Sequence, residues 1–432
     1  MAQSVPLESR QKAAVGSVLI AAFLNLLGFT MALPINVALR GHFDLTTGAS
    51  FGALSSAYPL GTLGALFLWP RLSDRVGRRP IISLSLAGSG IGLAAQCWAI
   101  HRGWSLQAFL SCRVLTGFCA GAGPVAKAYL ADIGAATGQL PRFMAWRDAA
   151  NTLAFIFGPF IGGWLYQFTG SLAAVIGTAA AGSLIASFLI FSFVREEDAA
   201  GAPATSKSGT APSSDAANSP EAMLAACPLG RQLYAAVATV CVISALYNCG
   251  SATFSAFFGP LAQKHAGLRV QGIGTAYTAL SAISFLVSTT CSAQSQRALG
   301  TVTTCILGLS CVGSGLVFMG AIASTVPTAQ YRLLHAGAFW AAAALYQIGV
   351  PLFAPTVPTM LLQCVPAKRR GALMGLDEAM NTIARVAAPI AFGGLYASSG
   401  AFACCGAAGA AVFLAAFVAA FRRFVVLRSA YD

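Results

Sequence analysis

Long apolar stretches separated by short polar ones fill most of this chain. Twelve such segments can be placed, each about 20 residues or longer. A bilayer-spanning helix needs roughly 20 mostly apolar residues, and only a helix satisfies its own backbone hydrogen bonds in lipid. The pattern therefore predicts an all-α, multi-pass membrane protein with twelve transmembrane helices. The segments are 14–38, 50–70, 80–100, 106–131, 144–167, 171–194, 231–258, 270–293, 299–322, 335–364, 371–396 and 400–421.

One polar interval is much longer than the others and differs in composition. Residues 195–230 are rich in Ser, Ala, Pro and Gly with scattered charge, a composition that buries little and favours a flexible linker. This predicts two six-helix bundles, 1–195 and 231–432, joined by a cytoplasmic linker at 196–230.

Lysine and arginine are distributed unevenly between the alternating polar intervals. With strict alternation, 18 of the 26 fall on one side, 5 on the other and 3 inside apolar segments. Positive charge favours the cytoplasmic side. We therefore expect both termini in the cytoplasm, with the protein in a plasma membrane or an organelle membrane.

The two predicted bundles contain a related segment. Residues 148–170 and 378–400 align without gaps and are identical at nine of 23 positions. These segments form the fifth helix of each bundle. We expect two pseudo-symmetric halves in parallel repeat, with a site between them near the middle of the membrane.

Composition narrows the function classes. The chain is 57% hydrophobic, 9% charged and carries a net charge of +13. No basic stretch is interleaved with aromatic residues, so nucleic acid is not an expected partner. The twelve cysteines show no metal-ligand spacing, and no nucleophile–base set occurs within the apolar segments, so no metal, no cofactor and no enzymatic activity are expected. The expected partners are the lipid bilayer and a small-molecule substrate, with the chain as a monomer.

The polar stretch "WPRLSDRVGRRP" at 69–80 holds four arginines and one aspartate. It resembles the loop signature of the major facilitator superfamily, G-x-L-x-D-R-x-G-R-R/K, except that Pro70 replaces the usual glycine. In that family the loop latches the two halves together on the cytoplasmic side. The matching residues implied as the latch are Asp74, Arg75, Gly77, Arg78 and Arg79. The alternative is that the arginines only mark the cytoplasmic side.

Two further motifs strengthen this resemblance. "RVLTG" (113–117) resembles the R-x-x-x-G motif of the family's helix four. "GPFIGG" (158–163) resembles the G-P-x-x-G-G motif of its antiporters, which implies a seal between the halves rather than simple helix packing. The chain is thereby similar to the tetracycline-efflux and drug:proton antiporter branch. The residues of the implied seal are Gly158, Pro159, Gly162 and Gly163.

Polar residues inside the apolar segments are candidates for a substrate cavity or for coupling. Arg113 lies about 10 Å into the fourth segment at 1.5 Å per residue, and we expect Asn25 or nearby backbone carbonyls to accept its hydrogen bonds. Arg385 poses the same question in the second half. Both arginines fit either a structural role or contact with an anionic or polar substrate. The set of candidates comprises Asn25, Arg113, Asn248, Gln347 and Arg385.

Proton coupling is implied by the resemblance, but helix one carries Asn25 where the tetracycline-efflux branch has an aspartate, and Asn does not titrate. The remaining proton-exchange candidates are Asp148, Asp377 and Glu378, which also fit solvated helix caps. The leading hypothesis is a secondary active transporter of a small organic solute, working by alternating access and coupled to protons as an antiporter for efflux. The alternatives are a facilitative uniporter or symporter of a polar metabolite, or a receptor without transport.

Overall fold

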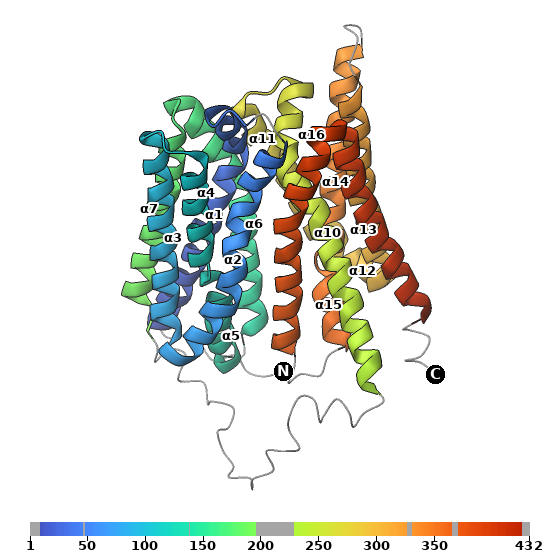
Figure 1. The fold of residues 1–432 in the computed structure, drawn as a ribbon. Coiled ribbons are helices and arrows are strands. Elements are labelled where there is room, and N and C mark those ends of the chain that lie inside the picture. The colour runs from blue at the N-terminus through green and yellow to red at the C-terminus, as the bar shows by residue number, and fades with distance from the viewer. Residues whose placement is uncertain are drawn as a thin grey trace.

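The computed structural model describes residues 9–45, 48–137, 139–195, 229–325, 331–364 and 370–425, and every regular element in these ranges is helical (Figure 1). The N-terminal half contains α1 (Ser9–His42), α2 (Gly48–Val76), α3 (Arg78–His101), α4 (Leu106–Cys119), α5 (Ala122–Thr137), α6 (Leu140–Thr169) and α7 (Leu172–Phe193). The C-terminal half contains α10 (Leu229–Ala266), α11 (Val270–Val287), η1 (Ser288–Ser292), α12 (Ala293–Leu299), α13 (Thr301–Ser324), α14 (Arg332–Phe353), α15 (Thr356–Cys364) and α16 (Arg370–Val425).

The helices form two groups that lie side by side (Figure 1). Within the first group α3 packs on α7, and α1 packs on α6 and α7; within the second, α16 packs on α10 and α13. The most extensive contacts between the groups are those of α2 with α16 and of α6 with α11, and α1 makes smaller contacts with α10 and α11. The predicted linker falls outside the described residues, apart from its last two.

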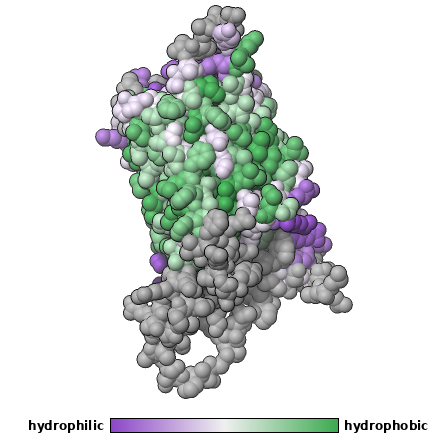
Figure 2. Space-filling view, turned by 90° about the vertical axis from the view of Figure 1, so that its right-hand side faces the viewer, coloured by the Kyte–Doolittle hydropathy of each residue, from purple (hydrophilic) through white to green (hydrophobic). Residues whose placement is uncertain are grey.

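The prediction of a multi-pass membrane protein is confirmed. Nine helices in the described part of the chain are long and apolar enough to span a membrane, among them the 48-residue stretch Gly375–Arg422. That stretch turns at Gly400 (φ 80°), so it contains two rods, and α2 and α6 add two further long helices with charged residues near one end. This arrangement is consistent with the twelve predicted segments. Apolar residues cover the middle of the face in Figure 2, and hydrophilic ones gather toward its ends.

Several of the membrane-length rods are interrupted along their length. The fourth rod breaks at Ala120–Gly121 between α4 and α5, and the tenth breaks at Ala354–Pro355 between α14 and α15. Pro355 has no N–H and cannot continue the hydrogen-bond ladder of α14. The second break lies next to the space between the halves, because Ala354 and Pro355 both line it.

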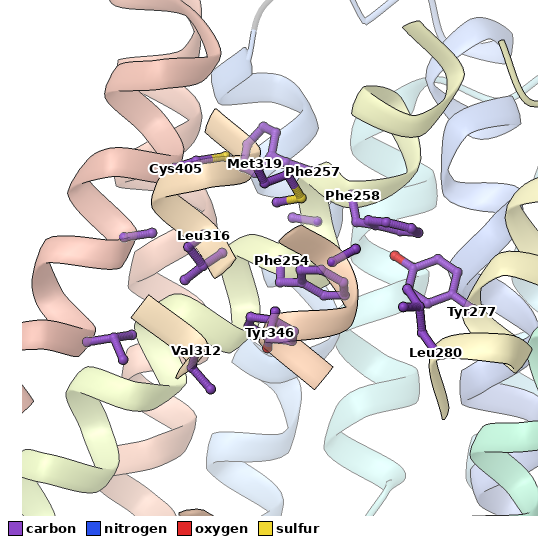
Figure 3. Packing of buried hydrophobic residues seen from close by; sticks show 14 of the residues in the cluster. Phe254, Phe257, Phe258, Tyr277, Leu280, Val312, Leu316, Met319, Tyr346 and Cys405 are labelled. Atoms are coloured by element: carbon purple, nitrogen blue, oxygen red, sulfur yellow. The ribbon is translucent and has the colours of Figure 1, made fainter. Parts of the chain in front are cut away.

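A cluster of aromatic rings fills the inner part of the C-terminal half (Figure 3). Phe254 of α10 stacks on Tyr346 of α14 with ring centroids 4.0 Å apart, and Phe258 meets Tyr277 of α11 edge-on at 4.9 Å. Such pairs add about 0.5–1.5 kcal/mol each beyond their burial. The cluster therefore holds α10, α11 and α14 together as one wall of the central space.

Candidate functional site

Two adjoining cavities lie between the halves. The smaller, of about 490 Å³, is lined by α1, α2, α4 and α6 on one side and by α10 and α16 on the other. The larger, of about 1080 Å³, extends from Tyr277 and Gln347 to Arg297 and Thr301 at the α12–α13 turn. The two share Leu33, Phe155, Ser251 and Ser255. Together they form a space that extends toward the end of the molecule carrying the α12–α13 turn.

Arg113 extends from α4 into the smaller cavity. Its Nη2 donates to Asn36 Oδ1 on α1 at 3.4 Å, and Tyr58 of α2 lines the same wall. The expectation was that Asn25 or nearby backbone carbonyls accept from Arg113, and the described acceptor is instead the side chain of Asn36. Asn25 lines the same cavity, but the acceptor Asn36 lies eleven residues, or about three helical turns, further along α1. Helix depth estimated from the sequence was too coarse to separate them.

Arg385 extends from α16 into the same cavity from the opposite half. Its Nε donates to Asn248 Oδ1 of α10 at 2.8 Å, and its Nη1 lies 3.6 Å from Glu378 Oε1. Asn248 itself is buried and donates to Ser244 O, so its side chain is held on both sides. The cavity candidates predicted from sequence therefore include a fixed pair, with Asn248 positioning Arg385.

The three acidic candidates occupy different surroundings. Asp148 lines the larger cavity and its side chain is 75% exposed. Asp377 is buried in the C-terminal half and accepts from Asn381 Nδ2 at 3.0 Å. Glu378 faces Arg385. The structure thus brings one of them, Glu378, to a residue of the smaller cavity.

The glycines of "GPFIGG" allow close approach in two directions. A Cβ at Gly158 would overlap the hydroxyl of Thr30, and one at Gly162 would overlap the backbone carbonyl of Met31, both on α1. A Cβ at Gly163 would instead lie 3.1 Å from Val270 O on α11, across the boundary between the halves. Only the last of these contacts joins the halves.

Pro159 provides the tighter contact at the α6–α11 boundary. Its carbonyl oxygen occupies the position where a Cβ on Gly274 of α11 would be, and Thr278 Oγ1, one turn along, donates to Ile156 O at 2.7 Å. Proline removes the N–H that would otherwise bond the carbonyl four residues earlier, that of Phe155, and disturbs the helix ladder there. Thr278 binds the next carbonyl along, that of Ile156, and so adds a hydrogen bond from the other half to the turn of α6 that precedes the proline.

The α2–α16 boundary repeats this contact with the halves exchanged. The carbonyl of Pro389 occupies the position where a Cβ on Gly52 would be, and Ser56 Oγ donates to Val386 O at 2.7 Å. Pro389 is the repeat partner of Pro159. In both contacts the residue with the hydroxyl lies four positions after the glycine, and the hydroxyl donates to the backbone carbonyl three residues before the proline. Sequence reasoning missed Gly52, Ser56, Gly274 and Thr278. The signal that could have revealed them in the sequence is a Gly-x-x-x-Ser/Thr pattern shared by the second helix of each half.

The residues of the predicted latch contact only the N-terminal half among the described contacts. Arg78 Nη1 lies 2.7 Å from Asp74 Oδ1, and Arg78 Nε lies 3.4 Å from Asp132 Oδ2 of α5. Arg79 donates to Phe191 O of α7 at 2.6 Å and lies over the Phe191 ring. Arg75 is exposed. In this conformation the arginines tie α3 to α5 and α7.

Gly77 makes the sharp turn between α2 and α3. Its φ of 113° and ψ of 161° lie in a region that is open essentially to glycine alone. Gly300 occupies the corresponding turn before α13 with φ 79° and ψ 160°. Gly77 therefore has a structural role in the turn, and the second half keeps the same turn without the arginine cluster.

Replacing Asp74 by asparagine should change transport more than stability. Asp74 is the exposed partner of the Asp74–Arg78 pair, with 63% of its side chain accessible, and ion pairs at the surface contribute less than about 1 kcal/mol. In the conformation in which the implied latch joins the two halves, Asp74 would accept charged hydrogen bonds, and losing one of them removes about 1.5–3 kcal/mol from that conformation. Transport should therefore fall about tenfold or more. Flux of a labelled solute and thermal melting measure the two effects.

Asp132→Asn is the matched control, because it removes the other carboxylate that pairs with Arg78. Equal flux for the Asp74 and Asp132 variants would show that only the pairing of Arg78 matters, and unchanged flux in the Asp74 variant would exclude the latch.

Comparison with known proteins places these features in a family context. The family model of the Major Facilitator Superfamily matches residues 18–322. The class B tetracycline resistance protein of Escherichia coli is 28% identical over 153 residues, covering 34% of this chain and 36% of that protein. Major facilitator superfamily domain-containing protein 10 of Mus musculus is 37% identical over 114 residues, which cover 26% of this chain and 24% of that protein. The matched stretches thus span well under half the length of these relatives.

Solved structures share the fold over nearly the whole chain. The human organic anion transporter MFSD10 (TETRAN) has a TM-score of 0.57 at 18% identity, covering 95% of this chain and 100% of that one. A bacterial homologue of the human lysosomal transporter Spinster, inward-facing and unoccupied, has a TM-score of 0.70 at 14% identity, covering 98% of each chain.

Proposed function

Because this chain belongs to the Major Facilitator Superfamily, and is thus a transporter rather than an enzyme, we propose that it moves a small organic solute across a membrane by alternating access. The observation that carries the proposal is the asymmetry of the central space. The cavities reach the α12–α13 turn at one end, whereas α2–α16 and α6–α11 are closed by backbone-to-glycine contacts nearer the other end. Alternating access requires such a closed contact to open as the other end closes.

The proposal includes an orientation. The distribution of Lys and Arg supports cytoplasmic termini, so the larger cavity would face the cytoplasm, and the latch residues would join the halves after the cavity closes there. The closed contacts at Pro159 and Pro389 then form the outer gate. We propose two six-helix bundles, 1–195 and 231–432, as the moving bodies of a monomer, with the interval between them as the linker.

We further propose that transport is coupled to protons as an antiport. Asp148 supports this because its carboxylate lies in the cavity that extends to the α12–α13 turn, and Glu378 supports it because protonation would release Arg385. The tetracycline resistance proteins among the relatives support an efflux direction. The second candidate, a facilitative uniporter or symporter, is favoured by Asn25, since an amide in helix one does not titrate.

Proteoliposomes with an imposed pH gradient separate these mechanisms. The probes are labelled tetracycline and 2-naphthoate, with protein-free vesicles as the blank. For a one-to-one antiporter, a one-unit gradient should support accumulation of about tenfold, abolished by a protonophore. Asp148→Asn and Glu378→Gln should reduce the accumulation if they carry the proton. Equilibration that ignores the gradient would favour the uniporter, and no protein-dependent flux of either probe would contradict the proposed transport.

A further inference from the structure

The smaller cavity has a positively charged lining with no acidic residue among the described residues that form it. Arg113 enters from the N-terminal half and Arg385 from the C-terminal half. Three aromatic side chains are among the other residues that line the cavity, namely Phe29, Tyr58 and Phe155. A volume of about 490 Å³ lies within the range of small-molecule sites.

Arg113 is poorly compensated where it lies. Its described hydrogen bond to Asn36 is long, at 3.4 Å, and a guanidinium has five N–H donors arranged as a planar fork. Holding a cation in a largely apolar membrane interior is costly unless it is paired. The position is therefore better explained by a bound anion than by packing.

Arg385 is oriented for the same purpose. Asn248 holds its Nε at 2.8 Å, and the 3.6 Å separation of its Nη1 from Glu378 is longer than a hydrogen bond. An anion in the cavity would compete with Glu378 for this guanidinium. Phe155, the repeat partner of Arg385, lies in the same cavity, so the second half supplies a charge where the first supplies an aromatic ring.

Building on the proposed transport function, we infer that the smaller cavity binds a small organic anion with an apolar or aromatic body, its acidic group held by Arg113 and Arg385. A carboxylate or sulfonate accepts two parallel hydrogen bonds from a guanidinium. Because the arginines come from opposite halves, the anion links both bodies of the transporter.

Binding to the purified, detergent-solubilised full chain tests this inference with 2-naphthoate, 2-naphthalenesulfonate and the neutral 2-naphthamide. The two anions should raise the melting temperature and the amide should not. Arg113→Gln and Arg385→Gln should each weaken anion binding at least tenfold, and Arg113→Lys should restore part of it. Glu378→Gln should tighten binding several-fold by releasing Arg385.

Arg297→Gln is the matched control, because it removes the same charge from the adjoining larger cavity. It should leave anion binding within about twofold of the wild type. Arg113→Gln should also keep or raise the melting temperature without ligand, whereas a purely structural arginine would lower it.

Equal binding of naphthoate and naphthamide, or anion binding unchanged in both Arg113→Gln and Arg385→Gln, would overturn the inference. Tetracycline flux without arginine-dependent anion binding would leave the transport function standing and reject only this site. Arginine-dependent binding without flux would retain the site and reject transport.

Discussion

The substitution Gly274→Ala should open the contact between α6 and α11 and expose the central cavity at the end of the molecule opposite the α12–α13 turn. The added Cβ would overlap Pro159 O and lie 3.2 Å from the Cα of Gly163. Overpacking of this kind costs typically about 1–3 kcal/mol, and the cost falls only on the conformation in which these helices touch. Each 1.4 kcal/mol shifts an equilibrium about tenfold. We therefore expect about a tenfold larger population of the outward-open form.

The measurement is alkylation of Leu33→Cys, which lies where the two cavities meet, by a membrane-impermeant maleimide applied at the outer face. The background replaces the twelve native cysteines. Gly272→Ala is the control, since its Cβ would meet only the side chain of Leu268, at 3.2 Å and beyond. Equal rates for the two variants would show that the Gly274 contact does not close the gate. Gly52→Ala should behave like Gly274→Ala.

Alanine at position 77 should destabilise the protein by about 1–3 kcal/mol, because it cannot adopt a φ of 113° with a ψ of 161° without strain. The turn fixes the position of Arg78 relative to Asp74 and Asp132, so these two ion pairs should weaken with it. Denaturant titration in detergent micelles measures the change. Gly300→Ala should show a similar loss without involving the arginine cluster.

Gly123→Ala provides the comparison for both turn variants. Gly123 lies in α5, and an added Cβ would meet nothing within 4 Å. Alanine there should leave stability unchanged or raise it by about 0.5–1 kcal/mol. If Gly77→Ala were as stable as Gly123→Ala, the conformation of the α2–α3 turn would not be the constraint that the structure indicates.

Hydrophobic patterning predicted the class of fold because length and apolarity are averaged over whole segments. The repeat at 148–170 and 378–400 likewise survived in sequence, since it depends on residue identity at fixed spacing. Partners of individual side chains could not be predicted in this way. Asn36, rather than Asn25, binds Arg113 because helix rotation and tilt set the depth of each side chain, and these follow from packing against neighbouring helices.

The same limit applied to the proposed outer gate. Its glycines and hydroxyls are common residues in membrane helices, so their pattern carries little weight until Pro159 and Pro389 are seen to face them. Pro70 was another open point in the sequence. It lies inside α2, which continues through it, and its carbonyl accepts from Ser73 Oγ at 2.8 Å.

The exchanged contacts at Pro159 and Pro389 have the form of an isologous interface, in which the same patch on each of two subunits meets its copy across a two-fold axis. A homodimer of a single six-helix unit would form both contacts at once, from one glycine, one hydroxyl and one proline per subunit. Such a dimer must present identical walls to whatever lies on its axis. Joining the two units in one chain removes that restriction while keeping the interface. The walls of the cavity differ at one pair of repeat positions, with Phe155 on one side and Arg385 on the other. The symmetric contact would preserve the proposed gate, and the loss of symmetry beside it would allow the proposed anion to be bound in one defined orientation.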